Sequence, residues 1–112
     1  MLIYKIFRAD EWKTLQDQGV TDGAPIDLQD GYIHFSTAEQ ARETAAKHFA
    51  GEDALILAAV DAAALGADLK WEASRGGALF PHLYKSLHIT DVVWHQSLRL
   101  NGDTHVFPME MV

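Results

Sequence analysis

The sequence predicts a single α+β domain, and three features of the chain support this. Its 112 residues match the usual size of one domain. Of these residues 48% are apolar, and a chain of this length can bury enough apolar surface to form a core without disulfides. Strand-like and helix-like segments alternate in the first half, whereas the second half is mostly strand-like. We therefore expect one domain over residues 1–112, with a β-sheet and two N-terminal helices.

The first half of the chain is predicted to contain two strands and two helices. Residues with high β propensity mark the strands, and caps and glycine stops bound the helices. Between the first helix and the second strand, Gly23, Pro25 and several aspartates break any period, so a loop is expected there. The expected elements are a strand over 2–7, a helix over 9–19, a loop over 20–29, a strand over 31–35 and a helix over 37–49.

The second predicted helix begins with two overlapping capping boxes. Ser36 with Glu39 fits the motif, and Thr37 with Gln40 fits it one residue later. A strand that stops at a helix N-terminus is a common place to hold a negatively charged ligand. The stretch "GYIHFSTAEQ" is therefore the best lead to a function.

The second half of the chain is predicted to be mainly strand. A near-continuous apolar run over 55–60 indicates a central strand that is covered on both faces. One helical turn is expected over 62–65. Strands over 69–72 and 80–84 flank a glycine-containing loop, and Asn101-Gly102 predicts a C-terminal hairpin.

Charge and composition argue against several classes of function. The net charge of −7 and the scattering of nine Lys and Arg residues argue against broad binding of nucleic acid or anionic membranes. No apolar run is long enough to span a bilayer, and no targeting segment is visible. The absence of cysteine excludes disulfides and thiolate metal sites, and it suits a cytoplasmic protein.

The histidine in the second predicted strand is the first candidate functional residue. Because side chains alternate along a strand, Ile33 and Phe35 are expected to face the core. Tyr32, His34 and Ser36 then share the other face. His34 and Ser36 would lie about 6.5–7 Å apart, close enough to grip two parts of one ligand. The alternative is a hydrogen-bonded histidine with a structural role.

The segment "FPHLY" has a second candidate histidine, flanked by aromatic residues. Alternation points Phe80, His82 and Tyr84 to one side of the strand. An imidazole between two aromatic rings would suit a flat heterocyclic ligand. The alternative is an aromatic corner of the core, with Pro81 marking an edge strand.

Other chemistries have weaker support in the sequence. No two histidines have the i, i+4 or His-x-His spacing of a zinc site, so no metal is expected. Ser36 lacks the glycine-flanked elbow of a serine hydrolase. The glycine motif of dinucleotide-binding proteins and the Walker-type phosphate loop are both missing from the sequence.

Four segments together resemble one known family. They are "IYKI", "DGYIHFSTAEQ", "LKWE" and "FPHLY", and in this order they are similar to the bacterial domain-of-unknown-function family 952 over nearly the whole chain. No activity is assigned to that family as such. The resemblance implies a fold like that of the ADP-ribosyltransferase superfamily, a split β-sheet that binds NAD in the cleft between its halves.

The motifs of that superfamily imply roles for individual residues. Its first motif is a strand with His-x-Ser or His-x-Thr, which matches His34 and Ser36; the imidazole there holds the adenosine ribose and the carboxamide end of NAD. An aromatic motif stacks on nicotinamide, and Tyr84 or Phe80 would fill that role. The resemblance thus implies a cofactor-binding set of His34, Ser36, Thr37, Phe80, His82 and Tyr84.

A glutamate of the superfamily grips the nicotinamide ribose, and two residues are candidates for it. Glu72 is the first candidate. It precedes the aromatic segment, whereas the superfamily usually places its glutamate last, so Glu110 is the alternative. RNA-phosphotransferase relatives hold phosphate with several arginines, and Arg75 is the main candidate for such a role here.

The predicted function is binding of NAD or a related nucleotide. If the domain is catalytic, the implied chemistry is that of an ADP-ribosyltransferase or NAD glycohydrolase, which cleaves the nicotinamide–ribose bond. His34 would orient the ribose, and Glu72 would stabilise the oxocarbenium charge. The alternatives are a non-enzymatic nucleotide-binding module and a protein-interaction module with a degenerate site. The sequence names no protein partner.

Overall fold

The computed structural model describes residues 1–109 and 111, with Arg75 described by its backbone. In this part of the chain helices and antiparallel strands are intermixed, which confirms the α+β class. The helices are α1 (Ala9–Gln18), α2 (Pro25–Asp30), α3 (Ala38–His48) and α4 (Ala62–Leu65). The strands are β1 (Leu2–Phe7), β2 (Val20–Thr21), β3 (Ile33–His34), β4 (Leu55–Asp61), β5 (Leu69–Ala73), β6 (Leu79–Leu83), β7 (Leu87–His88), β8 (Val92–Asn101) and β9 (Thr104–Val106). Short 3₁₀ turns cover Gly66–Asp68, Arg75–Gly77 and Ile89–Asp91.

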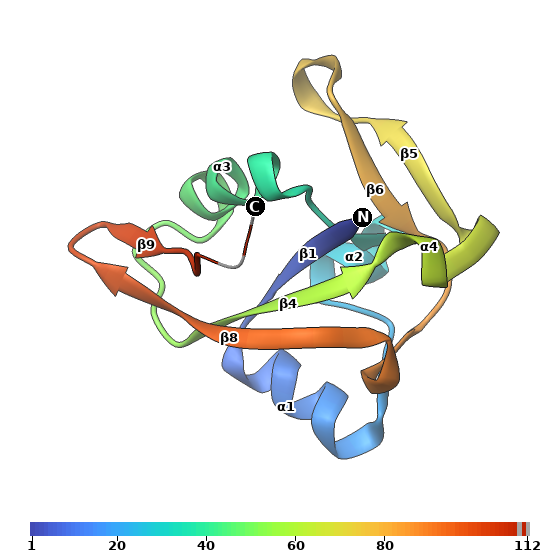
Figure 1. Cartoon of the computed structure of the whole chain (residues 1–112), viewed down its shortest axis with the longest axis horizontal. Coiled ribbons are helices and arrows are strands. Elements are labelled where there is room, and N and C mark those ends of the chain that lie inside the picture. The colour runs from blue at the N-terminus through green and yellow to red at the C-terminus, as the bar shows by residue number, and fades with distance from the viewer. Residues whose placement is uncertain (110, 112) are drawn as a thin grey trace.

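The strands of the described residues are divided among three sheets. Their orders are β1-β4-β8-β9, β3-β6-β5 and β2-β7. Figure 1 shows that the β5–β6 hairpin projects away from the four-stranded sheet. The two larger sheets meet where Tyr4 and Ser36 exchange two backbone hydrogen bonds of 2.7 and 2.8 Å. This junction brings the chain that follows β3 beside β1.

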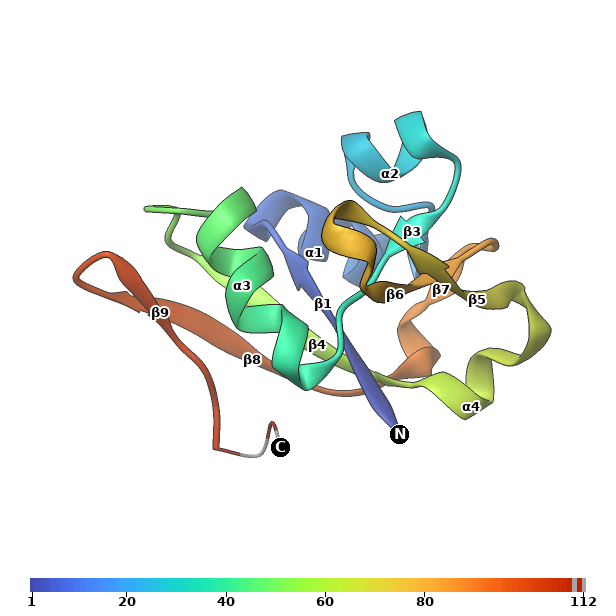
Figure 2. The same cartoon turned by 90° about the horizontal axis from the view of Figure 1, so that it is seen from above.

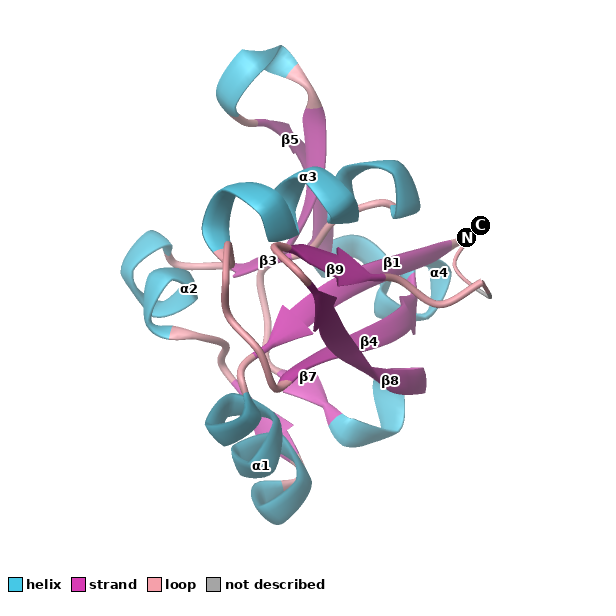
Figure 3. Cartoon of the chain, turned by 90° about the vertical axis from the view of Figure 1, so that its left-hand side faces the viewer, coloured by secondary structure: helices cyan, strands magenta, loops and turns pink. Residues whose placement is uncertain are grey.

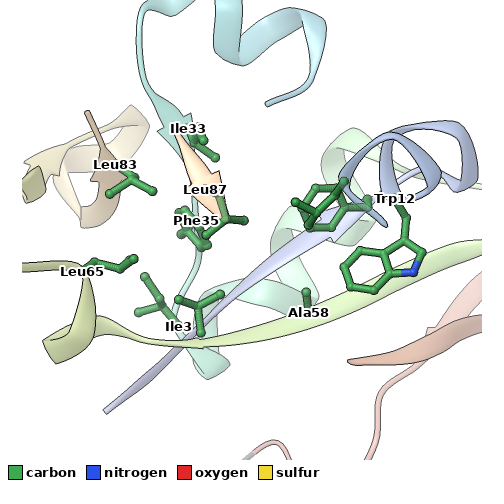
Figure 4. Packing of buried hydrophobic residues seen from close by; sticks show 11 residues of the cluster. Ile3, Trp12, Ile33, Phe35, Ala58, Leu65, Leu83 and Leu87 are labelled. Atoms are coloured by element: carbon green, nitrogen blue, oxygen red, sulfur yellow. The ribbon is translucent and has the colours of Figure 1, made fainter. Parts of the chain in front are cut away.

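Strand alternation on β1 and β4 separates the core into two clusters. On one face, Ile3 and Phe7 pack with Trp12 of α1, in the cluster shown close up in Figure 4. On the other face, Tyr4 and Ile6 of β1 pack with small residues of α3. Figures 2 and 3 show α3 packed over β1 and β4, with α1 on the opposite side. The prediction of a central strand covered on both faces is therefore confirmed for β4.

The ends of the two longer helices follow the sequence signals. Gly19 stands at the C-cap of α1 with φ of 76°, in the left-handed region that glycine enters without strain. At the start of α3, the second of the two overlapping capping boxes forms. Thr37 Oγ1 accepts a bond of 3.2 Å from the Gln40 N–H, and Gln40 Oε1 accepts one of 3.0 Å from the Thr37 N–H.

The prediction of a loop over residues 20–29 is wrong, because this stretch contains β2 and α2. Pro25 occupies the first turn of α2, where its missing N–H costs nothing. Asp27 accepts a hydrogen bond of 2.8 Å from the N–H of Ala24, the residue before the helix. Gly31 ends the helix with φ of 87°. Three helices therefore precede β4 in the described chain, and not two as predicted.

Two predicted strands have different boundaries in the structure. The strand expected over 31–35 is reduced to β3, because Gly31 belongs to the cap of α2 and Ser36 pairs with β1. The strand expected over 80–84 begins and ends one residue earlier, so that Tyr84 follows β6. The one-turn helix over 62–65 is confirmed. The C-terminal hairpin is also confirmed, with Asn101 and Thr104 as its last pair. No helix among the described residues is long and apolar enough to cross a membrane.

Candidate functional site

Four rings and one carboxylate gather on one side of the β3-β6-β5 sheet, and we call this group the His–Tyr face. It consists of Tyr32, His34, Glu72, His82 and Tyr84. His34 of β3 and His82 of β6 are directly paired across the two strands, and their ring centroids lie 5.4 Å apart. The Tyr32 ring contacts three others, with centroid distances of 4.1 Å to His82, 4.7 Å to His34 and 5.2 Å to Tyr84.

Glu72 of β5 is held at this face by two hydrogen bonds. Its Oε1 atom accepts a bond of 2.6 Å from the Tyr84 hydroxyl and lies 2.9 Å from Nδ1 of His82. The bonds from Tyr84 and His82 lower the pKa of the Glu72 carboxyl. The bond to Glu72 in turn raises the pKa of the Tyr84 phenol to about 12. Glu72 is therefore ionised at neutral pH, and 39% of its side chain is exposed.

His34 lies between two aspartates of α2. Its Nδ1 atom is 2.6 Å from Oδ1 of Asp27, and its Nε2 atom is 3.0 Å from Oδ2 of Asp30. The Asp27 side chain is fully buried, whereas 35% of the Asp30 side chain is exposed. The two ring nitrogens of His34 therefore face two very different carboxylates.

Asp27 is the centre of a buried polar network under the His–Tyr face. Its Oδ2 atom is 2.9 Å from Nζ of Lys5, and its Oδ1 atom accepts a hydrogen bond of 3.1 Å from the His34 N–H. Lys5 also donates to the His34 carbonyl at 3.2 Å. Burial by itself raises the pKa of Asp27, but the bond from His34 and the charge of Lys5 outweigh it and lower the pKa to about 2. Asp27 is thus a buried anchor for His34 that is ionised at neutral pH.

The structure brings together most of the candidate residues from the sequence. His34, Glu72, His82 and Tyr84 all contribute to the His–Tyr face, and Phe80 is directly opposite Glu72 on the neighbouring strand. These residues come from segments that are about 50 residues apart in the chain, and the pairing of β3 with β6 unites them.

Ser36 and Thr37 are placed differently from the other candidates. Ser36 is buried, and its hydroxyl lies 3.1 Å from the hydroxyl of Thr44 on α3. The Thr37 side chain caps α3. Both hydroxyls are thus engaged with α3, and the structure does not place them beside the His34 ring.

Three charged residues of the site, Lys5, Asp27 and Asp30, were missed by sequence reasoning. Lys5 shares the β1 face of Ile3 and Phe7, and a lysine on an apolar face is a signal of a buried partner. Asp27 lay in the stretch predicted as loop. The order of Pro25, Asp27 and Gly31 matches a short capped helix, and this pattern was the available signal for α2.

Two other features of the described residues are separate from this site. A hollow of about 420 Å³ is lined by α1 and β8, including Trp12, Trp94 and His95, and it lies away from the His–Tyr face. Among the described side chains, no group of three or more His, Asp and Glu residues is arranged to hold a metal ion.

Comparison with known protein families shows to which family the chain belongs. The family model described as "Protein of unknown function (DUF952)" matches residues 6–95. The chain belongs to this family. The match includes all members of the His–Tyr face as well as Asp27 and Asp30. No functionally curated protein matches this DUF952 chain.

Solved structures similar to this DUF952 chain come from Caulobacter crescentus. The crystal structure of protein CC0527 is 52% identical in sequence, with a TM-score of 0.90 over 94% of this chain and 92% of that one. A solution NMR structure of CC0527 is 53% identical, with a TM-score of 0.83 over 93% of this chain and 90% of that one. The chain thus shares its fold with an experimentally determined protein over nearly its full length.

Proposed function

We propose that the His–Tyr face binds NAD or a related nucleotide, in a fold of the ADP-ribosyltransferase kind. The observation that carries the proposal is the convergence of two histidines, two tyrosines and an ionised glutamate on one partly exposed face. This combination offers ring surfaces for a flat base, hydrogen-bonding groups for a ribose and a negative charge for a cationic ring.

The position of His34 supports the likeness to ADP-ribosyltransferases. In that superfamily a histidine on a strand contacts NAD between the two halves of a split sheet. His34 is on β3, and two residues later the chain crosses to the four-stranded sheet at the bridge between Ser36 and Tyr4. A histidine at the junction of two sheets is the arrangement that this likeness requires.

The aromatic rings supply the stacking surface of the proposed site. Tyr84 is 40% exposed, and its hydroxyl is tied to Glu72. A ring held in this way loses little further freedom when a ligand stacks on it. Stacking of one base on one aromatic side chain contributes about 1–3 kcal/mol. Tyr84 is therefore the residue to which we assign the nicotinamide or adenine ring.

Glu72 provides the chemistry that a catalytic version of this site needs. Cleavage of the nicotinamide–ribose bond builds positive charge on the ribose, and an ionised carboxylate nearby stabilises that charge. The hydrogen bonds from His82 and Tyr84 both go to Oε1 of Glu72. We therefore propose that the other oxygen of Glu72, Oε2, faces the nicotinamide ribose of NAD. The alternative acid, Glu110, and the side chain of Arg75 lie outside the described part of the structure.

A nucleotide-binding module without turnover is the second candidate function. It is favoured by the contacts of Asp27 and Asp30 with both nitrogens of His34, because they leave neither nitrogen free to act as a general base for an acceptor, which transfer requires and binding does not. Release of nicotinamide from NAD separates the two functions. Saturable NAD binding without release of nicotinamide would show that the protein is a binding module. Binding with release of nicotinamide would show that it is an enzyme.

The proposal is tested by measuring NAD affinity in two matched variants, one at Tyr84 and one at Trp71 of β5. Tyr84→Ala removes a ring of the face, and we expect it to weaken NAD binding by about tenfold, the scale of one stacking contact. Trp71→Ala removes an equally exposed ring at the position next to Glu72, where the side chain points to the opposite side of the strand. Trp71→Ala should bind NAD like the wild type. Equal losses in both variants, or no binding by the wild type, would contradict the proposal.

A further inference from the structure

The two aspartates at His34 differ in how firmly they are held. Asp27 is fixed by Lys5 and by the N–H groups of Ala24 and His34. Its side chain has no exposed surface. Asp30 is the last residue of α2 and is partly exposed, with its Oδ2 atom 3.0 Å from Nε2 of His34. Asp27 therefore orients the imidazole ring, while Asp30 covers the ring nitrogen that faces outward.

A ligand that contacts His34 has to take the place of Asp30. Oδ1 of the buried Asp27 engages Nδ1, so Nε2 is the nitrogen that remains for a ligand atom. Two aromatic rings, those of Tyr32 and His82, flank the imidazole. The Asp30 carboxylate thus occupies the position where an oxygen of the ligand would lie.

We propose that Asp30 is a specificity-determining residue of the His–Tyr face, which holds Nε2 of His34 in the free protein and is replaced there by an oxygen acceptor of the ligand. The inference rests on the proposed function, and for NAD the oxygen is a ribose hydroxyl. Asp30 disfavours the binding of ligands that offer no such oxygen, because the contact between Asp30 and His34 is then lost and no ligand contact replaces it. It also lowers the affinity for NAD, since its charge repels the pyrophosphate.

The placement of Asp30 on α2 agrees with this role. A helix C-terminus carries partial negative charge, so an aspartate at the last helical residue is electrostatically unfavourable there. Its contact with His34 offsets this cost in the free protein. Removal of the charge should therefore leave the melting temperature nearly unchanged.

The first test compares the NAD affinity of Asp30→Asn with that of the wild type. We expect the variant to bind NAD about fivefold more tightly, the upper range for one exposed charge contact. Asp103→Asn makes the same change of charge in the β8–β9 turn, which Figures 1 and 2 show at the opposite end of the molecule from β5. That control should bind like the wild type. Weaker or unchanged NAD binding by Asp30→Asn would overturn the proposal, because Asp30 would then contact the ligand or have no part in binding.

The second test needs no nucleotide. Diethyl pyrocarbonate modifies an accessible imidazole nitrogen, and the rate at His34 is followed by mass spectrometry of peptides. We expect Asp30→Ala, which removes the covering carboxylate altogether, to react several-fold faster at His34, with the exposed His48 as internal reference. An unchanged rate at His34 would show that Asp30 does not cover Nε2 and would overturn the proposal. A faster rate in a protein that binds no NAD would overturn the proposed function and the identity of the ligand, while the covering role of Asp30 would stand.

Discussion

Tyr32 is stacked on His82, with ring centroids 4.1 Å apart and planes inclined by 28°. Tyr32 lies between α2 and β3, whereas His82 is in β6. The same His82 holds Glu72 through Nδ1. The stack therefore connects the segment that carries His34 to the hairpin that carries Glu72. Such a link keeps the groups of the His–Tyr face in one arrangement before a ligand arrives, which reduces the entropy lost on binding.

The charge of Glu72 should matter for catalysis more than for affinity. Glu72→Gln keeps the shape of the side chain and an oxygen that accepts from Tyr84. We expect NAD affinity to stay within a few-fold of wild type. Any NAD cleavage should fall by about 10²-fold or more, the scale of losing one preorganised electrostatic group. Calorimetry and release of nicotinamide measure the two quantities.

Glu43→Gln is the matched control for Glu72→Gln, because it removes a carboxylate from the exposed surface of α3. It should leave both affinity and cleavage unchanged. Wild-type cleavage in Glu72→Gln would clear Glu72 of a catalytic role and direct attention to Glu110.

The hydrogen bond between Tyr84 and Glu72 should be visible in an alkaline titration. The pKa of Tyr84 is raised from 10.0 to about 12 by its bond to Glu72. The bond exists only while the phenol keeps its proton, so its contribution is complete below pH 10 and is lost as the pH rises through about 12. In Glu72→Gln the pKa of Tyr84 should fall back toward 10. NMR of the tyrosine rings measures this, and a Tyr84 pKa that is the same in both proteins would contradict the bond.

The buried network around Asp27 should make the fold sensitive to acid. Its pKa is lowered from 3.8 to about 2, so its contribution to stability is complete above pH 4 and is lost as the pH falls through 2. A difference of this size corresponds to about 2 kcal/mol of unfolding free energy. Urea unfolding at pH 5, 4, 3 and 2 measures the loss.

The double variant Lys5→Met, Asp27→Asn is the control for the acid effect. Removing both partners avoids a buried lysine without its carboxylate, which typically costs about 3–5 kcal/mol. In this variant the free energy of unfolding should depend less on pH between 4 and 2. An unchanged dependence would show that other carboxyls cause the acid sensitivity.

Truncation of Ile33 should mainly reduce stability, whereas truncation of His34 should mainly abolish NAD binding. Ile33 is 2% exposed in the core, and Ile33→Ala should cost about 2–5 kcal/mol through the cavity that it leaves. His34→Ala removes one partner of Asp27 but leaves Lys5 and two backbone N–H groups, so its cost should be smaller, about 1–3 kcal/mol. NAD binding should be lost only in His34→Ala. If that variant is the less stable of the two, His34 is a structural residue.

Most of the fold could be predicted because its strongest elements have local signals. The apolar run of β4 and the Asn101-Gly102 turn need no information from elsewhere in the chain. The six-residue helix α2 is too short to show a helical period, and only its caps mark it. The sheet orders also depend on pairings across long stretches of chain, which composition and periodicity do not reveal.

The site was predictable in part for the same reason. Alternation placed His34 on one face of its strand and grouped His82 with Tyr84, because the direction of a strand side chain is a local property. The contact of Lys5 with Asp27 joins residues on β1 and α2, and no local pattern reports it. Ser36 lies beyond the end of β3, where it pairs with Tyr4 of β1 and its hydroxyl is engaged by Thr44 of α3.

The central claim is that the His–Tyr face binds NAD, and its most direct test is an NMR titration of the ¹⁵N-labelled wild-type protein with NAD. We predict saturable shifts of the resonances of Tyr32, His34, Glu72, His82 and Tyr84. The resonances of Trp12 and His95, in the hollow between α1 and β8, should stay in place. Shifts confined to that hollow, or no saturable shifts at millimolar NAD, would contradict the account.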